Sequence, residues 1–202
     1  MKKRGFVVTF ASPSGGGKST ICNEVLKINP LFCYSISWTT RELRGDEVNG
    51  KDYFFIDIET FKQKIDEDFF LEYAEVHGNF YGTSREFITD CIEKEKIVLL
   101  DIDVQGVELL KKQGIDVVTI FILPPSERIL EDRLVKRGTD TTEVINKRLE
   151  NAKKEIEYLQ GYDYLVINDN IQDAINTVNC ILIAETNKQK RYIDPVKEYY
   201  RS

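Results

Sequence analysis

The sequence is poor in the residue types that build metal sites and disulfide frameworks. Its 202 residues include four cysteines and one histidine. The cysteines, Cys22, Cys33, Cys91 and Cys180, show no C-x-x-C spacing. We therefore expect neither a zinc site nor a disulfide framework, and four reduced thiols fit a cytoplasmic protein best.

Long apolar runs and an excess of positive charge are also absent. No uninterrupted apolar stretch reaches the roughly 18 residues of a membrane-spanning helix, and the basic start at residues 1–4 runs into a strand rather than the apolar segment of a secretion signal. The formal net charge is -6, whereas a nucleic-acid groove needs basic surface along its length. We expect no membrane insertion, no secretion and no nucleic-acid partner, while a small anionic ligand held locally stays open.

The chain has neither internal repeats nor Pro/Gly-rich linkers, and 42% hydrophobic with 31% charged residues is typical of a globular domain. Short apolar runs alternate with amphipathic segments, and near-continuous apolar runs are typical of parallel strands buried on both faces. The expected strands are residues 5–11, 96–103, 116–123 and 162–168, and the expected helices are residues 20–28, 127–136, 142–159 and 171–184. This order predicts an α/β fold with an open parallel sheet, helices on both faces and ligands at the carboxyl ends of the strands.

Residues 37–95 break this alternation. Aromatic and polar residues alternate there, and Gly45, Asn49-Gly50 and Gly78-Asn79 indicate turns. The pattern predicts a small antiparallel insertion that supplies a second binding site and moves independently on closure.

Residues 12–19, Ser-Pro-Ser-Gly-Gly-Gly-Lys-Ser, lie between the first strand and the first helix. Three glycines let the backbone approach a phosphate group closely, and the helix that begins at Lys18 adds its positive dipole end. Lys18 reaches the outer phosphates, and the Ser19 hydroxyl can ligate Mg²⁺. The order of strand, loop and helix favours a phosphate loop over an inert turn.

Ser12 departs from the usual pattern G-x-x-x-x-G-K-[ST], in which the first position is glycine. A serine fits there only if the backbone does not require positive φ.

Three further segments resemble guanylate kinase. They are residues 35–53 (SISWTTRELRGDEVNGKDY), 70–83 (FLEYAEVHGNFYGT) and 100–106 (LDIDVQG), and the likeness runs from the phosphate loop to Asn168-Asp169. The resemblance implies a P-loop NTPase-type fold with an inserted small α+β GMP-binding lobe and a helical lid. It divides the chain into a core (residues 1–36, 97–126 and 150–202), the GMP-binding lobe (37–96) and the lid (127–149). The implied reaction is ATP + GMP giving ADP + GDP, with Mg²⁺ and with dGMP as a further acceptor, in purine nucleotide metabolism.

The acceptor site follows from residue chemistry and from the resemblance. Arg41 and Arg44 suit a bidentate grip on a phosphate, although two arginines in a loop are more often solvated. A carboxylate acceptor distinguishes guanine, which presents N–H donors, from adenine. The resemblance places GMP on Ser37, Arg41, Arg44, Glu47, Tyr53, Glu72, Tyr81, Gly82, Thr83 and Asp103.

The donor site and its metal are predicted in the same way. Asp101 ends a strand and can hold the water shell of Mg²⁺ beside Ser19, or it merely hydrogen-bonds the turn. Arg133, Arg137 and Arg148 lie in or beside the lid, where they either neutralise the ATP phosphates or pair with nearby glutamates. The ATP-binding residues are expected to be Ser12, Pro13, Ser14, Gly15, Gly16, Gly17, Lys18, Ser19, Thr20 and, on the adenine side, Asn168.

Three alternatives stay open at this point. One is an inactive module of the same fold that binds a phosphorylated peptide, and another is a kinase of a phosphorylated sugar. The third, a nucleotide-dependent switch, lacks the Asn-Lys-x-Asp sequence that reads a base. Homo-oligomerisation is left open because a symmetric interface leaves no dependable mark in one sequence. The basic residues 188–191 are expected to form a solvated helix end.

Overall fold

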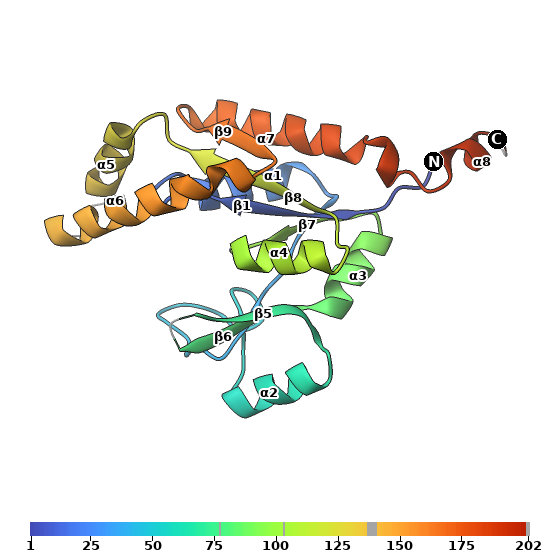
Figure 1. The fold of residues 1–202 in the computed structure, drawn as a ribbon, viewed down its shortest axis with the longest axis horizontal. Helices are drawn as coiled ribbons and strands as arrows, with labels where there is room; N and C mark the ends of the chain where they lie inside the picture. Colours follow the sequence, from blue (N-terminus) through green and yellow to red (C-terminus); the bar gives the residue numbers. More distant parts are fainter. Residues whose placement is uncertain (77, 103, 137–140, 201–202) are drawn as a thin grey trace. The chain divides into compact units, whose positions relative to one another are not determined.

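The computed structural model describes residues 1–76, 78–102, 104–136 and 141–200, with only the backbone described at Val104 and Gln105 (Figure 1). It divides into two compact units. The first unit comprises Met1–Thr9, Leu31–Val117 and Gln189–Ser202, and the second unit comprises Phe10–Pro30 and Val118–Lys188. Within the described residues, every helix is too short or too polar to cross a membrane.

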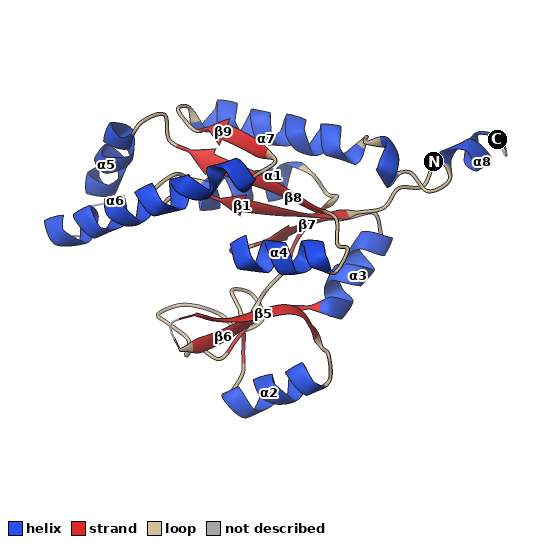
Figure 2. Ribbon diagram, in the orientation of Figure 1, coloured by secondary structure: helices blue, strands red, loops and turns tan. Residues whose placement is uncertain are grey.

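Three parallel strands form the central part of the first unit (Figure 2). They are β1 (Phe6–Ala11), whose last residues belong to the second unit, β2 (Phe32–Tyr34) and β7 (Ile97–Leu100), in the order β2-β7-β1. Ile97 is in register with Phe6 on one side and Phe32 on the other. All four side chains of β7 are buried, which agrees with the expectation from its continuous apolar sequence.

The first unit also contains a four-stranded sheet in the order β4-β3-β6-β5. Its strands are β3 (Trp38–Thr39), β4 (Phe54–Phe55), β5 (Phe70–Val76) and β6 (Asn79–Ser84). β6 pairs antiparallel with both β3 and β5, as expected, whereas β3 and β4 are parallel. The sheet lies within residues 37–96, the range predicted for the acceptor lobe.

Three helices accompany this sheet, α2 (Ile58–Asp66), α3 (Arg85–Glu93) and α4 (Val104–Lys112). The residue pattern predicted only the antiparallel strands, whereas the small α+β lobe that the resemblance implied agrees with α2 and α3. Asp57 caps the N-terminus of α2 through its carboxylate, which accepts from the Thr60 N–H, and the helix buries only Phe61. Phe61 stacks on Phe70 of β5, so a short helix with one anchoring side chain is sufficient here.

Buried side chains from both parts of the first unit share one apolar core. The members of this core are Val7, Leu71, Ile88, Cys91, Val98, Leu100, Val107, Leu110 and Val117. Because Leu71 belongs to β5 and Val98 to β7, the core ties the small sheet to the parallel strands of the same unit.

The chain returns to the first unit through η2 (Gln189–Arg191) and α8 (Pro195–Tyr199). The expectation of a solvated end at residues 188–191 was wrong for Arg191, which is 2% exposed. Its guanidinium donates to Asp116 and lies over the Phe6 ring, 3.6 Å from the ring centroid. An ion pair combined with ring stacking compensates the burial of this charge.

The second unit consists of the phosphate-loop segment and the C-terminal half of the core. Its elements are α1 (Lys18–Ile28), β8 (Val117–Leu123) apart from its first residue, α5 (Glu127–Lys136), α6 (Thr142–Glu157), η1 (Tyr158–Gly161), β9 (Tyr164–Ile167) and α7 (Ile171–Thr186). β8 and β9 pair in parallel, α1 packs on α7, and α5 packs on α6. These strands and helices agree with the ranges expected from the sequence, so the mostly parallel α/β fold is confirmed.

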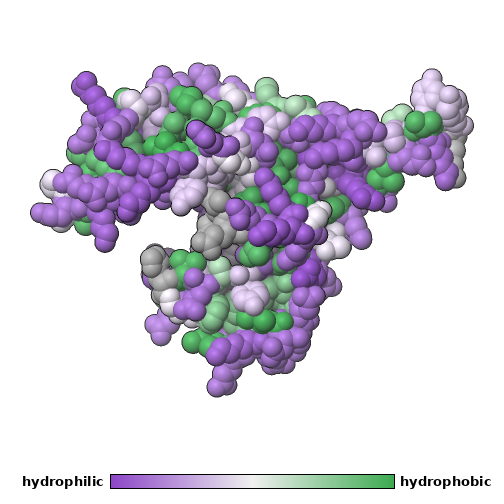
Figure 3. Space-filling model, viewed as in Figure 1, coloured by the Kyte–Doolittle hydropathy of each residue, from purple (hydrophilic) through white to green (hydrophobic). Residues whose placement is uncertain are grey.

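The long helix α6 lies at the surface of the second unit. Of its described side chains only Ala152 is buried, and the face seen in Figure 3 is largely hydrophilic. Its charged residues are therefore solvated on one side while a narrow apolar edge packs on α5.

Candidate functional site

The loop between β1 and α1 is built to receive an anion. α1 has no acidic residue in its first turn, and no side chain of the described residues caps its N-terminus. By contrast, α2, α3 and α7 are capped by Asp57, Ser84 and Asn170. No acidic side chain in the first turn of α1 therefore offsets the positive end of its helix dipole.

The three loop glycines each meet a distinct steric demand. Gly15 and Gly17 have φ of 93° and 101°, a region that favours glycine. Gly16 packs against the Ser12 side chain, whose Oγ would clash with any Cβ at this position. Ser12 itself is not among the non-glycine residues with positive φ, which in the described chain are Asp68, Glu95 and Asp194. The replacement of the first glycine by Ser12 therefore causes no backbone strain.

Helix α5 packs against the glycine loop through two leucine side chains. A Cβ on Gly15 would lie 3.1 Å from Leu134 Cδ2 and 3.2 Å from Leu130 Cδ1. Leu130 and Leu134 form a small core with Ala152 of α6. The fold of the segment predicted as the lid is thus connected by packing to the conformation of the phosphate loop.

The variant Leu134→Ala should be strongly destabilised. Leu134 is fully buried, and its removal deletes contacts to α6 and to Gly15. We expect a loss of about 2–5 kcal/mol of unfolding free energy in urea titrations. The neighbouring Val135 is 56% exposed, so Val135→Ala should change the unfolding free energy by less than about 0.5 kcal/mol. Equal effects of the two variants would contradict the packing described here.

The segment after β9 contacts the loop through Asn168. Asn168 Nδ2 donates to the Gly16 carbonyl at 2.7 Å, and Asn168 is 2% exposed. Arg133 Nη2 donates to the Asn168 carbonyl at 2.8 Å and to the Asp169 carbonyl at 3.4 Å. In this structure, Arg133 thus contacts the backbone of the expected adenine side.

The other cations predicted for the donor site lie in the same unit. Lys18 is half-buried at the start of α1, close enough to Glu155 of α6 for its charge to oppose the effect of burial, which raises the pKa of Glu155. Arg148 is half-buried on α6. Arg137 lies outside the described residues, so its predicted role stays a prediction.

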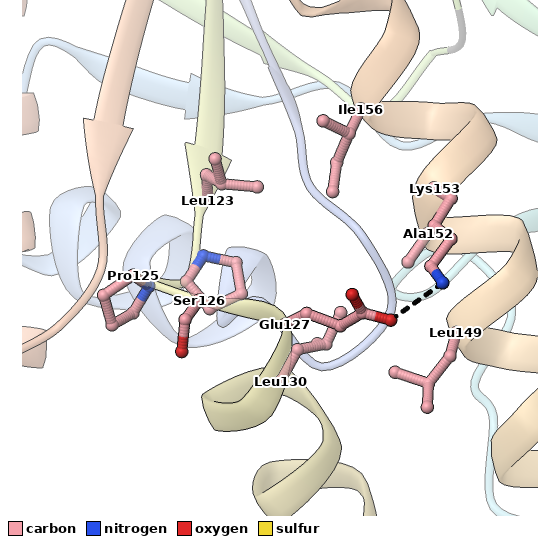
Figure 4. A pocket seen from close by; sticks show the side chains of 10 residues that line it. Leu123, Pro125, Ser126, Glu127, Leu130, Leu149, Ala152, Lys153 and Ile156 are labelled. Carbon is pink, nitrogen blue, oxygen red and sulfur yellow. Dashed lines mark ion pairs between the residues drawn. The ribbon is translucent and has the colours of Figure 1, made fainter.

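A small cavity lies between the start of α5 and α6 (Figure 4). It measures about 140 Å³ and is lined mainly by apolar side chains, among them Leu123, Leu149 and Ile156. The ion pair between Glu127 and Lys153, 3.0 Å long, lies at its edge. Because sites for drug-sized ligands measure about 300 Å³ or more, this cavity is too small for a nucleotide.

In the first unit, Arg41 and Glu47 form a two-point ion pair. Arg41 Nη1 and Nη2 donate to the two Glu47 carboxylate oxygens at 3.0 and 2.8 Å. Arg41 is 8% exposed, and hydrogen bonding to Glu47 raises its pKa, while the same bond lowers the pKa of Glu47. Both groups are therefore charged at neutral pH, and Glu47 holds the guanidinium in a fixed orientation.

Aromatic and hydroxyl groups surround this pair. The Arg41 guanidinium lies 5.2 Å from the Tyr53 ring centroid and 5.6 Å from that of Phe55, and Tyr81 packs edge-on against Tyr53. Burial raises the pKa of Tyr53, with a further contribution from the Asp101 charge, so its hydroxyl stays protonated. The side chain of Arg44 is exposed, and its backbone N–H donates to Glu47.

The remaining acceptor residues flank this cluster. Ser37 is half-buried immediately before β3, and its carbonyl accepts from the Phe54 N–H. Gly82 of β6 is buried under Phe70, whose ring would stand 2.7 Å from a Cβ at that position. The structure therefore gives Gly82 a packing role in the sheet.

Glu72 is buried, with 8% of its surface exposed, unlike the other acidic residues of its segment. The Thr83 hydroxyl donates to Glu72 Oε1 at 2.5 Å, and Glu72 Oε2 faces Gly106 of α4. The register of β5 and β6 shifts between Phe70 and Glu72, so Phe70, Leu71 and Glu72 are all buried. Such an irregularity breaks the usual alternation and turns the carboxylate inward.

Two carboxylates follow β7. Asp101 is exposed and lies near enough to Tyr53 to affect its pKa. Asp103, predicted to bind guanine, lies outside the described residues. The first unit thus contains the Arg41–Glu47 pair with its aromatic neighbours, the buried Glu72 carboxylate and Asp101.

The comparisons with known proteins identify the family of this chain. The guanylate kinase family model matches residues 3–185. The chain belongs to the guanylate kinase family. Its likeness extends over the parts of both units that contain the residues described above.

Individual relatives are similar over nearly their whole length. A guanylate kinase of Carboxydothermus hydrogenoformans is 46% identical over 188 residues, which cover 93% of this chain and 92% of the relative. A guanylate kinase of Clostridium perfringens (strain 13 / Type A) is 45% identical over 195 residues, which cover 96% of this chain and 88% of the relative. The crystal structure of guanylate kinase from Anaplasma phagocytophilum matches with a TM-score of 0.77 and 34% identity, covering 97% of this chain and 94% of that one.

Sequence reasoning missed several supporting residues of these sites. Leu130 and Leu134 lie within the expected helix 127–136, but their packing on Gly15 had no signal in the sequence. Glu47 was taken from the family resemblance alone, whereas the structure shows its physical task in holding Arg41.

Proposed function

We propose that this protein transfers the γ-phosphate of ATP to GMP and dGMP, giving ADP and GDP or dGDP, through an acceptor half-site in the first unit and a donor half-site in the second. Its family membership makes it a nucleoside monophosphate kinase. The observation that carries the choice of acceptor is the buried Glu72 carboxylate, in the same unit as the Arg41 phosphate clamp.

The acceptor phosphate is held by Arg41, Arg44, Ser37, Tyr53 and Tyr81. Arg41 is already oriented by Glu47, so little side-chain entropy is lost when a phosphate binds. The Tyr53 hydroxyl, kept protonated by its raised pKa, donates to the phosphate rather than repelling it. These contacts hold the nucleophilic phosphate oxygen in place for attack.

The base is recognised through Glu72, Thr83 and Asp103. Guanine presents an N1–H and an exocyclic amino group as donors, and an ionised carboxylate only accepts. Adenine has an unprotonated N1, which would face the Glu72 carboxylate without a hydrogen. The Thr83 hydroxyl orients that carboxylate by donating to its other oxygen.

The donor triphosphate is held by residues 12–20, with Lys18 as a point charge on the outer phosphates. Arg133, Arg137 and Arg148 add positive charge as the transferring group develops its loose, anionic transition state. The Ser12, Pro13 and Ser14 backbone completes the loop, and Asn168 lies beside it.

The chain offers a sparse donor set that suits Mg²⁺. Among the described residues, no group of three or more His, Cys, Asp or Glu is placed to hold a metal ion. The Ser19 hydroxyl and the Asp101 carboxylate are exposed oxygen donors, and Mg²⁺ typically takes one or two protein oxygens together with nucleotide phosphates. Bound Mg²⁺ neutralises phosphate charge, while Ser19 and Asp101 would hold it or its water shell.

The test is a panel of acceptors. Purified protein is mixed with γ-³²P-labelled ATP, Mg²⁺ and one of GMP, dGMP, AMP, CMP or UMP, and labelled diphosphates are separated. Label should appear in GDP and dGDP, with turnover of the other three at least about 100-fold lower. Binding of GMP without any label transfer would instead indicate an inactive binding module, and rates independent of the base would indicate a different acceptor class.

A further inference from the structure

Asn168, the residue that follows β9, is held by hydrogen bonds to both its backbone N–H and its carbonyl. The Asn168 N–H donates to the Leu123 carbonyl at 2.8 Å, which extends the β8–β9 ladder by one residue. Its carbonyl accepts from Arg133. With its backbone held on both sides and its side chain 2% exposed, Asn168 has little freedom to move.

The Asn168 side chain is directed at the phosphate loop. Nδ2 donates to the Gly16 carbonyl, and it is so close to Gly17 that any Cβ there would clash with it. Oδ1 is buried without a hydrogen-bond partner among the described residues. The amide is thus oriented by the loop carbonyl alone.

This hydrogen bond determines the direction of one loop N–H. In a planar trans peptide, the C=O and the following N–H point in opposite directions. Holding the Gly16 carbonyl toward Asn168 therefore turns the Gly17 N–H to the opposite side of the loop. Three consecutive glycines are conformationally permissive, so a contact from outside the loop adds to the internal bond from the Gly16 N–H to the Pro13 carbonyl in fixing this orientation.

We propose that Asn168 is a positioning residue of the phosphate loop, whose amide holds the Gly16–Gly17 peptide so that the Gly17 N–H faces the bound ATP phosphate. This deepens the proposed kinase function and rests on it. The family resemblance placed Asn168 on the adenine side, whereas the contacts assign its Nδ2 to the loop. Asn168 acts on the phosphates through Gly17 and does not touch them.

The variant Asn168→Asp separates this role from a general structural one. Ionised Asp has no hydrogen to donate, and it places a negative oxygen against the Gly16 carbonyl. Protonated Asp can donate an O–H in place of the amide. At pH 8 we expect kcat/KM for ATP to fall about 10- to 100-fold, and to recover relative to the unmodified protein as the pH is lowered.

Nearby charges determine the pH at which kcat/KM recovers. Arg133, which binds the Asn168 carbonyl, favours the ionised acid, whereas burial, Asp169 and the bound triphosphate favour the protonated one. The ratio of kcat/KM in Asn168→Asp to that in the unmodified protein is therefore measured from about pH 5.5 to 9. This range brackets a raised carboxyl pKa. Asn168→Ala should show the same loss at pH 8 without recovery.

Asn170→Asp is the matched control for the added charge. Asn170 is exposed two residues further on, where it caps α7 by accepting from the N–H groups of Gln172 and Asp173. An aspartate caps equally well, so activity should stay within about twofold at every pH. The proposal would be overturned if Asn168→Asp lost no more kcat/KM than this control. It would also be overturned if the loss in Asn168→Asp did not recover at lower pH.

A second measurement needs no variant. In ¹⁵N-labelled protein, ADP with Mg²⁺ should shift the Gly17 amide resonance downfield, and an unshifted Gly17 amide would overturn the proposal even if the variants do not fold. GMP affinity, measured by calorimetry, should be unchanged in every variant. Absence of any ATP-to-GMP transfer in the unmodified protein would instead refute the proposed function.

Discussion

The variant Lys18→Ala should lose phosphoryl transfer and keep GMP binding. Lys18 begins α1 directly after the glycine loop, where its charge acts on the outer phosphates of ATP. Removing a cation that neutralises the transferring group should lower kcat by at least about 10³-fold. The dissociation constant for GMP should change less than about twofold, because the described acceptor residues all belong to the first unit.

Lys27→Ala on the same helix is the control for this experiment. Lys27 is exposed and pairs with Glu24 at 2.8 Å on the surface. Its removal deletes one positive charge from α1 without touching the phosphate loop, so turnover should be unaffected. Turnover by Lys18→Ala at the level of Lys27→Ala would show that the loop does not hold the donor triphosphate.

The variant Glu72→Ala should lose the preference for GMP over AMP. The carboxylate is buried and accepts a hydrogen bond from the Thr83 hydroxyl, so it is held in a fixed orientation. The ratio of kcat/KM for GMP to that for AMP should fall by about 10²-fold, equivalent to about 3 kcal/mol. Parallel assays with both nucleotides give this ratio directly.

Glu75→Ala provides the comparison on the same strand. Glu75 is exposed on β5, and its removal changes the net charge by the same amount. Its selectivity should equal that of the unmodified protein, and thermal melting confirms that both variants are folded. An unchanged selectivity in folded Glu72→Ala would mean that guanine is read by other groups.

Much of the fold was predictable because hydrophobic periodicity reports burial directly. The apolar runs of β7 and β8 and the amphipathic pattern of α5 and α6 marked these elements to within a few residues. The residue pattern did not place α2 and α3 because each buries very few side chains and because neighbouring aromatic residues indicated strands. Arg191 was misjudged because a charge in a basic run gives no sign that it is buried and paired with a residue as distant in sequence as Asp116.

The candidate sites were predictable where local chemistry was sufficient. The glycine loop needs only neighbouring residues, so its sequence already indicates a phosphate site. Glu72 could not be separated from Glu67 and Glu75 because its burial depends on a strand irregularity and on α4, which is distant in sequence. The contact between Asn168 and Gly16 spans 152 residues and therefore had no local signal.

The division into donor and acceptor half-sites is tested most directly by amide hydrogen exchange with each nucleotide alone. GMP should slow exchange within residues 37–83 and leave residues 12–20 unchanged. A non-hydrolysable ATP analogue with Mg²⁺ should slow exchange within residues 12–20 and at Asn168 and leave residues 37–83 unchanged. Protection of the phosphate loop by GMP alone, with residues 37–83 unaffected, would contradict the assignment of both sites.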